Sequence, residues 1–187
     1  MENAEWQEII AANNTLTDQE KHFNTLCTEY RKFASGWLLA TFSGAGFVLT
    51  NANSLPYPQE LLIALLGYAG SVGMVTLWNI DIGLYHRLLD AAFTEGLKLE
   101  ENYPQLPQTR HNMVKLQGGR GIQPRVSWFY SLPIFILLFI ATWNLDGYLG
   151  ISGWTAWGLW LGTFFVYSAF SSYIRNDNTL NFRRKVK

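Results

Sequence analysis

Charged residues are absent from four long blocks of this 187-residue sequence, although the whole chain carries 14 Lys and Arg and 14 Asp and Glu. The blocks are residues 33–59, 61–80, 126–145 and 147–174, and they also lack histidine. Each contains a window of about 20 residues, the length of a helix that crosses a ~30 Å hydrocarbon layer. Four buried helices of a soluble protein are the alternative, but such helices normally keep a polar face. Residues 132–140 (LPIFILLFI) have no such face, so we predict an all-α polytopic membrane protein.

The lack of ionisable side chains inside these blocks bears on function. Proton-coupled carriers and ion pumps generally need a carboxylate, a histidine or a lysine within the membrane. The polar groups that the spans do contain are hydroxyls and amides. These groups either line a water-filled path in an oligomer or bond to their own helix and its neighbours. The sequence therefore argues against a carrier or a pump.

Signatures of enzymes and metal sites are also missing. The chain has one cysteine, so Cys27 forms no internal disulfide, and it contains no HExxH, GxSxG or CxxC motif. Its three histidines, His22, His86 and His111, do not have the spacing of metal ligands. GGRG at residues 118–121 is too short for a phosphate-binding loop and fits a linker better. We predict no catalytic residue, no metal, no cofactor and no nucleic-acid site.

The distribution of basic residues predicts the topology. The connections between the first two blocks and between the last two, residues 51–59 and 146–150, contain no Lys or Arg. Four spans therefore place all 14 basic residues on one side, which is the cytoplasmic side by the positive-inside rule. We expect an inner-membrane protein with both termini in the cytoplasm. The predicted segments are a cytoplasmic N-terminal segment (1–32), a hairpin (33–80, spans 34–50 and 61–80), a cytoplasmic stem and loop (81–126), a second hairpin (127–174, spans 127–145 and 153–174) and a basic tail (175–187).

The second span is predicted to continue as a long helix outside the membrane. Residues 60–101 contain no proline, and Pro104 and Pro107 follow. Helical spacing puts an apolar stripe on one side of the extension, with Leu84 and Leu88 among its members, and a polar line on the other. The first helix is expected to begin at a capping box, residues 17–20 (TDQE), and to run into the first span. A short helix is expected around residues 110–117.

Small residues recur at the four-residue steps that let membrane helices approach closely. The pattern fits packing inside one chain and also association between copies, and the sequence does not separate the two. The predicted helix-packing residues are Gly36, Ala40, Gly44, Gly67, Ser71, Gly73, Gly158 and Gly162.

Asn79, Asp81 and Tyr85 lie at the inner end of the second span and are our candidate vestibule residues. In a ring of copies, Asp81 would form an acidic ring that favours cations. The alternative is an ordinary residue at the exit of the helix, in the headgroup zone.

The layout of the first half of the chain resembles that of small helical bacterial membrane proteins. The features are a charged lead-in (EKHFNTLCTEYRKFA), a two-span hairpin, Trp78 at the inner end of the second span, and a stem that ends in LEENYPQLP. This layout is similar to the RipA family, to CRISPR-associated membrane accessory proteins and to SLATT-type hairpins of phage-defence loci. The resemblance covers about residues 18–107. It implies a ring-like homo-oligomer with a pore or membrane-perturbing role.

Two main functions of different classes follow, and a membrane-embedded enzyme that uses His86 or His111 is the third, less favoured one. One is a non-enzymatic homo-oligomer in the lipid bilayer that forms a pore or perturbs the membrane, as a defence-type effector controlled by a cytoplasmic partner. The other is a non-conducting scaffold or accessory subunit that docks a cytoplasmic protein through its helix-2 stem.

Overall fold

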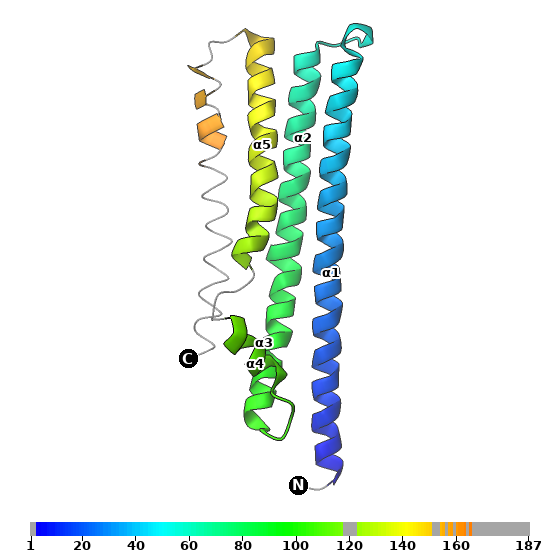
Figure 1. Ribbon diagram of the computed structural model, residues 1–187, viewed down its shortest axis with the longest axis vertical. Helices are drawn as coiled ribbons and strands as arrows, with labels where there is room; N and C mark the ends of the chain where they lie inside the picture. Colours follow the sequence, from blue (N-terminus) through cyan, green and yellow to red (C-terminus); the bar gives the residue numbers. More distant parts are fainter. Residues whose placement is uncertain are drawn as a thin grey trace. The chain divides into compact units, whose positions relative to one another are not determined.

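The computed structural model describes residues 3–117, 123–150 and, beyond these, 154, 155, 157, 158, 160–163 and 165. All secondary-structure elements among the described residues are helices, and these residues contain no strand, as predicted. The elements are α1 (Asn3–Thr50), a 3₁₀ turn η1 (Ala52–Ser54), α2 (Gln59–Ile80), a π-helical segment η2 (Asp81–Tyr85), α3 (His86–Asn102), α4 (Thr109–Gln117) and α5 (Gln123–Leu149) (Figure 1).

Three of these helices are long and apolar enough to cross a membrane. They are α1, the continuous helix Gln59–Asn102, and the Val126–Leu149 part of α5. The first three predicted spans lie within them. The predicted fourth span, residues 153–174, lies largely outside the described residues, as does the basic tail.

The start of α1 differs from the prediction. Helix α1 is already helical at Asn3, so residues 17–20 lie in its interior and do not form a capping box. The Thr17 hydroxyl donates to the Asn13 carbonyl, 2.9 Å away, which is the back-bond typical of a Thr inside a helix. Residues 3–16 contain no Gly or Pro, so no residue breaks the helix before Thr17.

The predicted long helix of residues 60–101 agrees with the structure, which adds one irregularity. The backbone is helical from Gln59 to Asn102, but between α2 and α3 it widens into η2, where the His86 N–H donates to the Asp81 carbonyl. A π turn inside an α-helix holds one extra residue and turns the side chains that follow. The helix ends before Pro104, and the Tyr103 N–H closes its last turn on the Leu99 carbonyl at 3.0 Å.

The chain divides into two compact units. Unit 1 comprises Met1–Tyr30 and Ile80–Pro124, and unit 2 comprises Arg31–Asn79 and Arg125–Lys187.

Unit 2 is built by close helix contact. Figure 1 shows α2 between α1 and α5. At Gly67 an added Cβ would lie 2.8 Å from Cβ of Ala141 on α5, and at Gly70 it would lie 2.6 Å from Cγ2 of Thr41 on α1. The glycines therefore set the spacing of the three helices, because any side chain there would push them apart.

In unit 1, the faces of the stem agree with the prediction only in part. Ala92, on the apolar stripe, is buried as expected, but Leu84 and Leu88 on the same stripe are 50% and 40% exposed. Thr94, which helical spacing puts on the polar line, is buried, and so is Glu100. Buried polar side chains usually have a specific partner, and the carboxylate of Glu100 is bonded to Arg110 and His111.

Candidate functional site: a buried arginine cluster

A buried arginine lies at the centre of unit 1. Arg110, in the first turn of α4, is only 4% exposed. Its guanidinium bonds side chains from α1 and α3, so one residue joins three helices. The Arg110 cluster consists of Asn13, Thr17, Glu20, Glu100, Arg110 and His111.

Glu100 caps the start of α4 from a different helix. Its Oε1 accepts the Arg110 backbone N–H at 3.0 Å, and its Oε2 accepts the His111 backbone N–H at 3.1 Å. These are two of the N–H groups that a helix leaves unpaired at its first turn, and a carboxylate there also interacts favourably with the helix dipole. Further polar contacts come from the Arg110 guanidinium at 3.2 Å and from His111 Nδ1 at 3.0 Å.

These bonds determine the charge state of Glu100. Burial of the carboxyl raises its pKa, but the Arg110 backbone N–H, the ring and backbone of His111 and the Arg110 charge all lower it. The lowering contributions are larger, so the pKa of Glu100 lies below its ordinary value. Glu100 is therefore held as a carboxylate, the form that accepts hydrogen bonds from the start of α4.

The guanidinium also fastens α1. Arg110 Nε donates to Glu20 Oε1 at 2.5 Å, Nη1 donates to Asn13 Oδ1 at 2.8 Å, and Nη2 donates to Thr17 Oγ1 at 3.1 Å. Gly96 makes room for this arrangement, because a Cβ there would collide with the guanidinium. All three nitrogens of the guanidinium thus have an acceptor, as a buried charge requires.

The cluster is suited to holding helices rather than to catalysis. It has two carboxylates and one guanidinium, and both oxygens of Glu100 are occupied by donors. No group of three or more potential metal ligands occurs in the described ranges. From the sequence, Arg110 and His111 are expected only as members of a short helix around residues 110–117, and residues 17–20 only as a capping box. No local signal in the sequence distinguishes Glu100 from its neighbours Lys98 and Glu101, so its partners could not have been found from the sequence.

The candidate vestibule residues have different environments. Asn79 is half-buried, and its amide donates to the Val75 carbonyl at 3.0 Å. Asp81 is fully buried within the single chain. Tyr85 is half-buried, and its ring stacks on Tyr30 with the centroids 5.1 Å apart.

The predicted helix-packing residues fall into two groups. Those on α2 have close neighbours within unit 2: Gly67 lies against α5, Gly73 lies under the Trp37 ring, and Ser71 is buried with its hydroxyl on the Gly67 carbonyl at 2.8 Å. Gly44 on α1 is less tightly packed, since an added Cβ would lie 3.5 Å from Leu66.

The second group has no close neighbour in the described part of the chain. An added Cβ at Gly36, Gly158 or Gly162 would meet nothing within 4 Å, and Ala40 is exposed. Intramolecular packing therefore accounts for the small residues of α2, and the other faces are available to lipid or to a partner.

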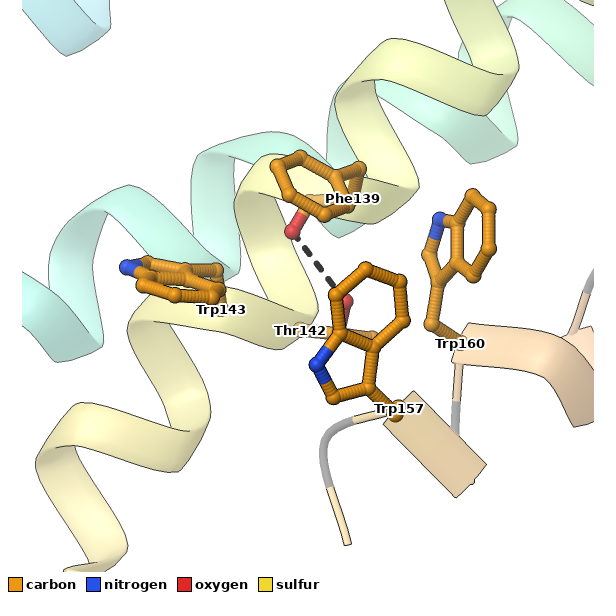
Figure 2. Close-up of a pocket in the computed structure, with 5 residues that line it drawn as sticks. All are labelled: Phe139, Thr142, Trp143, Trp157 and Trp160. Carbon is orange, nitrogen blue, oxygen red and sulfur yellow. Dashed lines mark hydrogen bonds between the residues drawn. The ribbon is translucent and has the colours of Figure 1, made fainter. Parts of the chain in front are cut away.

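Several hydroxyls and amides in the spans bond to their own helices. Figure 2 shows an aromatic pocket of about 10 Å³ formed by Phe139, Trp143, Trp157 and Trp160 around Thr142. The Thr142 hydroxyl donates to the Leu138 and Phe139 carbonyls, at 2.8 and 3.1 Å, so its hydrogen is not directed into the pocket. The same i→i−4 bond occurs at Thr41, Ser71, Thr76, Asn79 and Asn144. These six side chains therefore bond to their own helix within the single chain.

No protein family, curated protein or solved structure matches this chain. The likeness to RipA-type and SLATT-type hairpins stays an expectation from sequence layout, and the geometry of the chain itself carries the functional argument.

Proposed function

We propose that this protein is a non-enzymatic membrane scaffold that docks a cytoplasmic protein through its stem, residues 81–102. The apolar helices anchor it in the bilayer, and the stem presents a docking face. The observation that carries the proposal is the exposure of Leu84 and Leu88, which are 50% and 40% exposed one turn apart on the same helix.

The stem has the composition of an interface. Ala91, one turn beyond Leu88, is also exposed, so three apolar residues follow one face. After them comes an exposed ion pair, Lys98 to Glu95, with 2.7 Å between Nζ and Oε1. An apolar centre with a charged rim is the usual anatomy of a protein interface. Burying one leucine contributes about 1.5–3 kcal/mol, so two leucines form a substantial contact.

The Arg110 cluster supports this proposal because it makes the stem rigid. Arg110 and Glu100 tie α3 to α4, and Arg110 with Glu20 ties both to α1. A preordered surface loses less conformational entropy on binding than a flexible one does.

The test is photo-crosslinking in cells, with the crosslinking amino acid at Leu88 and, as a matched control, at Glu101, an exposed residue of the stem outside the apolar face and its charged rim. We expect one discrete protein adduct from position 88 and a weaker adduct or none from position 101. The crosslinked protein is then purified and titrated against the full chain in nanodiscs. Leu84→Ser with Leu88→Ser should weaken binding about tenfold or more, and Glu101→Gln should leave it unchanged. Adducts with lipid alone at position 88, or equal affinity for the double variant, would overturn the proposal.

A homo-oligomeric pore or membrane-perturbing protein is the second candidate. Gly158 and Gly162 favour it, since they form a GxxxG face that meets nothing within 4 Å. The distinguishing measurement is the particle mass in nanodiscs together with bilayer conductance. A closed ring whose conductance changes with Asp81→Asn and Asn79→Ala would favour the pore, whereas a silent monomer or dimer would favour the scaffold.

A further inference from the structure

A groove on the surface of unit 2 combines an apolar lining with one cation. It has a volume of about 430 Å³, within the range of small-molecule sites. Its lining residues are Lys32, Phe33, Gly36, Trp37 and Ala40 from α1 and Leu77 from α2. From Lys32 to Ala40 the helix rises about 12 Å, which is close to the depth of one leaflet of the hydrocarbon layer, about 15 Å.

The floor of the groove is open because of two small residues. Ala40 is exposed, and a Cβ added at Gly36 would meet nothing within 4 Å. One wall is Phe33, which is 63% exposed.

The opposite wall, Trp37, is fixed in place. Its indole N–H donates to the Gly70 carbonyl of α2 at 3.0 Å, and its ring lies over Gly73, where any side chain would collide with it. This wall of the groove therefore keeps its position without an occupant, as the walls of ligand sites usually do.

The charge in the groove is at one end only. Lys32 is exposed and immediately precedes the uncharged block 33–59, so it lies where the hydrocarbon layer gives way to headgroups. The other five lining residues are apolar or aromatic. A groove of this kind is complementary to an amphiphile with a negative head and a long apolar tail. Basic pockets beside membrane helices bind anionic lipid heads in this way.

We propose that this groove binds one anionic phospholipid, with an acyl chain along Gly36 and Ala40 and the phosphate at Lys32. The lipid would cover an apolar face of α1 that the rest of the described chain leaves exposed. This inference is independent of the proposed docking function, which concerns residues 81–102.

The test measures lipid binding to the full-length protein by native mass spectrometry, with phosphatidylglycerol and phosphatidylcholine as probes. Gly36→Leu fills the groove, and Gly46→Leu is its matched control, because Gly46 lies on the same helix and also has nothing within 4 Å. We expect the wild-type protein to prefer phosphatidylglycerol, and Gly36→Leu to weaken its binding about tenfold. Gly46→Leu should bind as the wild type does.

A second variant tests the contact with the lipid headgroup separately from the contact with the acyl chain. Its result tests the proposal even if the Gly36→Leu protein does not fold. Lys32→Gln leaves the groove open, so we expect it to reduce the preference for phosphatidylglycerol over phosphatidylcholine about fivefold. Lys21→Gln, an exposed lysine on the same helix, should not change this preference. Equal binding of the two lipids by the wild-type protein, or unchanged preference in Lys32→Gln, would overturn the proposal. So would a Gly36→Leu protein that binds lipid normally but no longer self-associates, because the groove would then hold a second copy.

Discussion

The buried side chain of Arg110 joins α1, α3 and α4 within unit 1. Its side chain is 5% exposed and faces two carboxylates, one of which, Glu100, is completely inaccessible. Removing one partner of a buried ion pair costs far more than the pair itself contributes, because the other charge stays buried without compensation.

We expect Arg110→Met to lower the free energy of unfolding by about 3–5 kcal/mol. Lys98→Met is the matched control, since Lys98 pairs with Glu95 but both side chains are more than half exposed. Such a surface pair contributes about 1 kcal/mol or less. Denaturant unfolding of the solubilised protein would measure both, and equal losses in the two variants would contradict a buried anchor.

The lowered pKa of Glu100 gives a second prediction, on pH. Because the folded-state pKa lies below the unfolded-state value of about 4.3, the carboxylate stabilises the fold above that value. This stabilisation is lost as the pH falls through the folded-state pKa. The groups that face Glu100 are Arg110 and His111, and Glu20 reaches the same guanidinium.

The measurement is the midpoint of thermal unfolding against pH for the wild type and for Glu100→Gln. The difference between them should be constant at neutral pH and should shrink below about pH 4.3. Glu95→Gln, at a site whose side chain is 59% exposed, should track the wild type. A Glu100→Gln curve parallel to the wild type down to the acid end would exclude the depressed pKa.

At the scale of elements, the helices of unit 2 depend on glycine for their distance of approach. At Gly67 a Cβ would lie 2.8 Å from Ala141 Cβ and 3.0 Å from the Leu137 carbonyl oxygen, which belongs to a rigid helix backbone. Gly46 has the same local preference for helix but open space around it.

Gly67→Ala and Gly46→Ala therefore form a matched pair with opposite expected signs. Gly67→Ala should destabilise the protein by about 1–3 kcal/mol, because α2 and α5 must separate. Gly46→Ala should stabilise it by up to about 1 kcal/mol, because alanine is the better helix former. Thermal unfolding in detergent would show both, and stabilisation by Gly67→Ala would mean that α2 and α5 are not in close contact.

At the scale of the whole molecule, the prediction concerns orientation. The connection that contains Ser54 has no basic residue, while the stem carries Lys98, so the positive-inside rule places them on opposite sides of the membrane. Both residues are exposed and accept a reporter, and the native Cys27 is buried, which keeps background labelling low.

In cells whose plasma membrane is intact and accessible from outside, an impermeant maleimide should label Ser54→Cys. It should not label Lys98→Cys until that membrane is permeabilised. The unaltered chain, with Cys27 alone, is the control for background. Labelling of Lys98→Cys from outside would reverse the orientation and remove the basis for a cytoplasmic docking partner.

The sequence by itself determined the features that depend on local composition. An uncharged run long enough for a bilayer, such as residues 61–80, predicts a membrane helix whatever surrounds it. The absence of proline from residues 60–101 likewise predicts the continuous helix Gln59–Asn102. The back-bonding of Thr142 needs only its own helix. The predicted helix start at residues 17–20 was wrong, because residues on the N-terminal side of this motif also favour a helix and outweigh it.

Only the tertiary structure decided which residues meet. Glu100 caps α4 from α3, Arg110 reaches Glu20 across 90 positions of sequence, and Gly67 rather than Gly36 contacts α5. Helical periodicity gives the faces of each helix but not their partners. The π segment η2 also turns the side chains beyond Tyr85, so the face of α3 cannot be extrapolated from α2. Pairings between distant residues depend on how helices pack in three dimensions, and no local pattern records that.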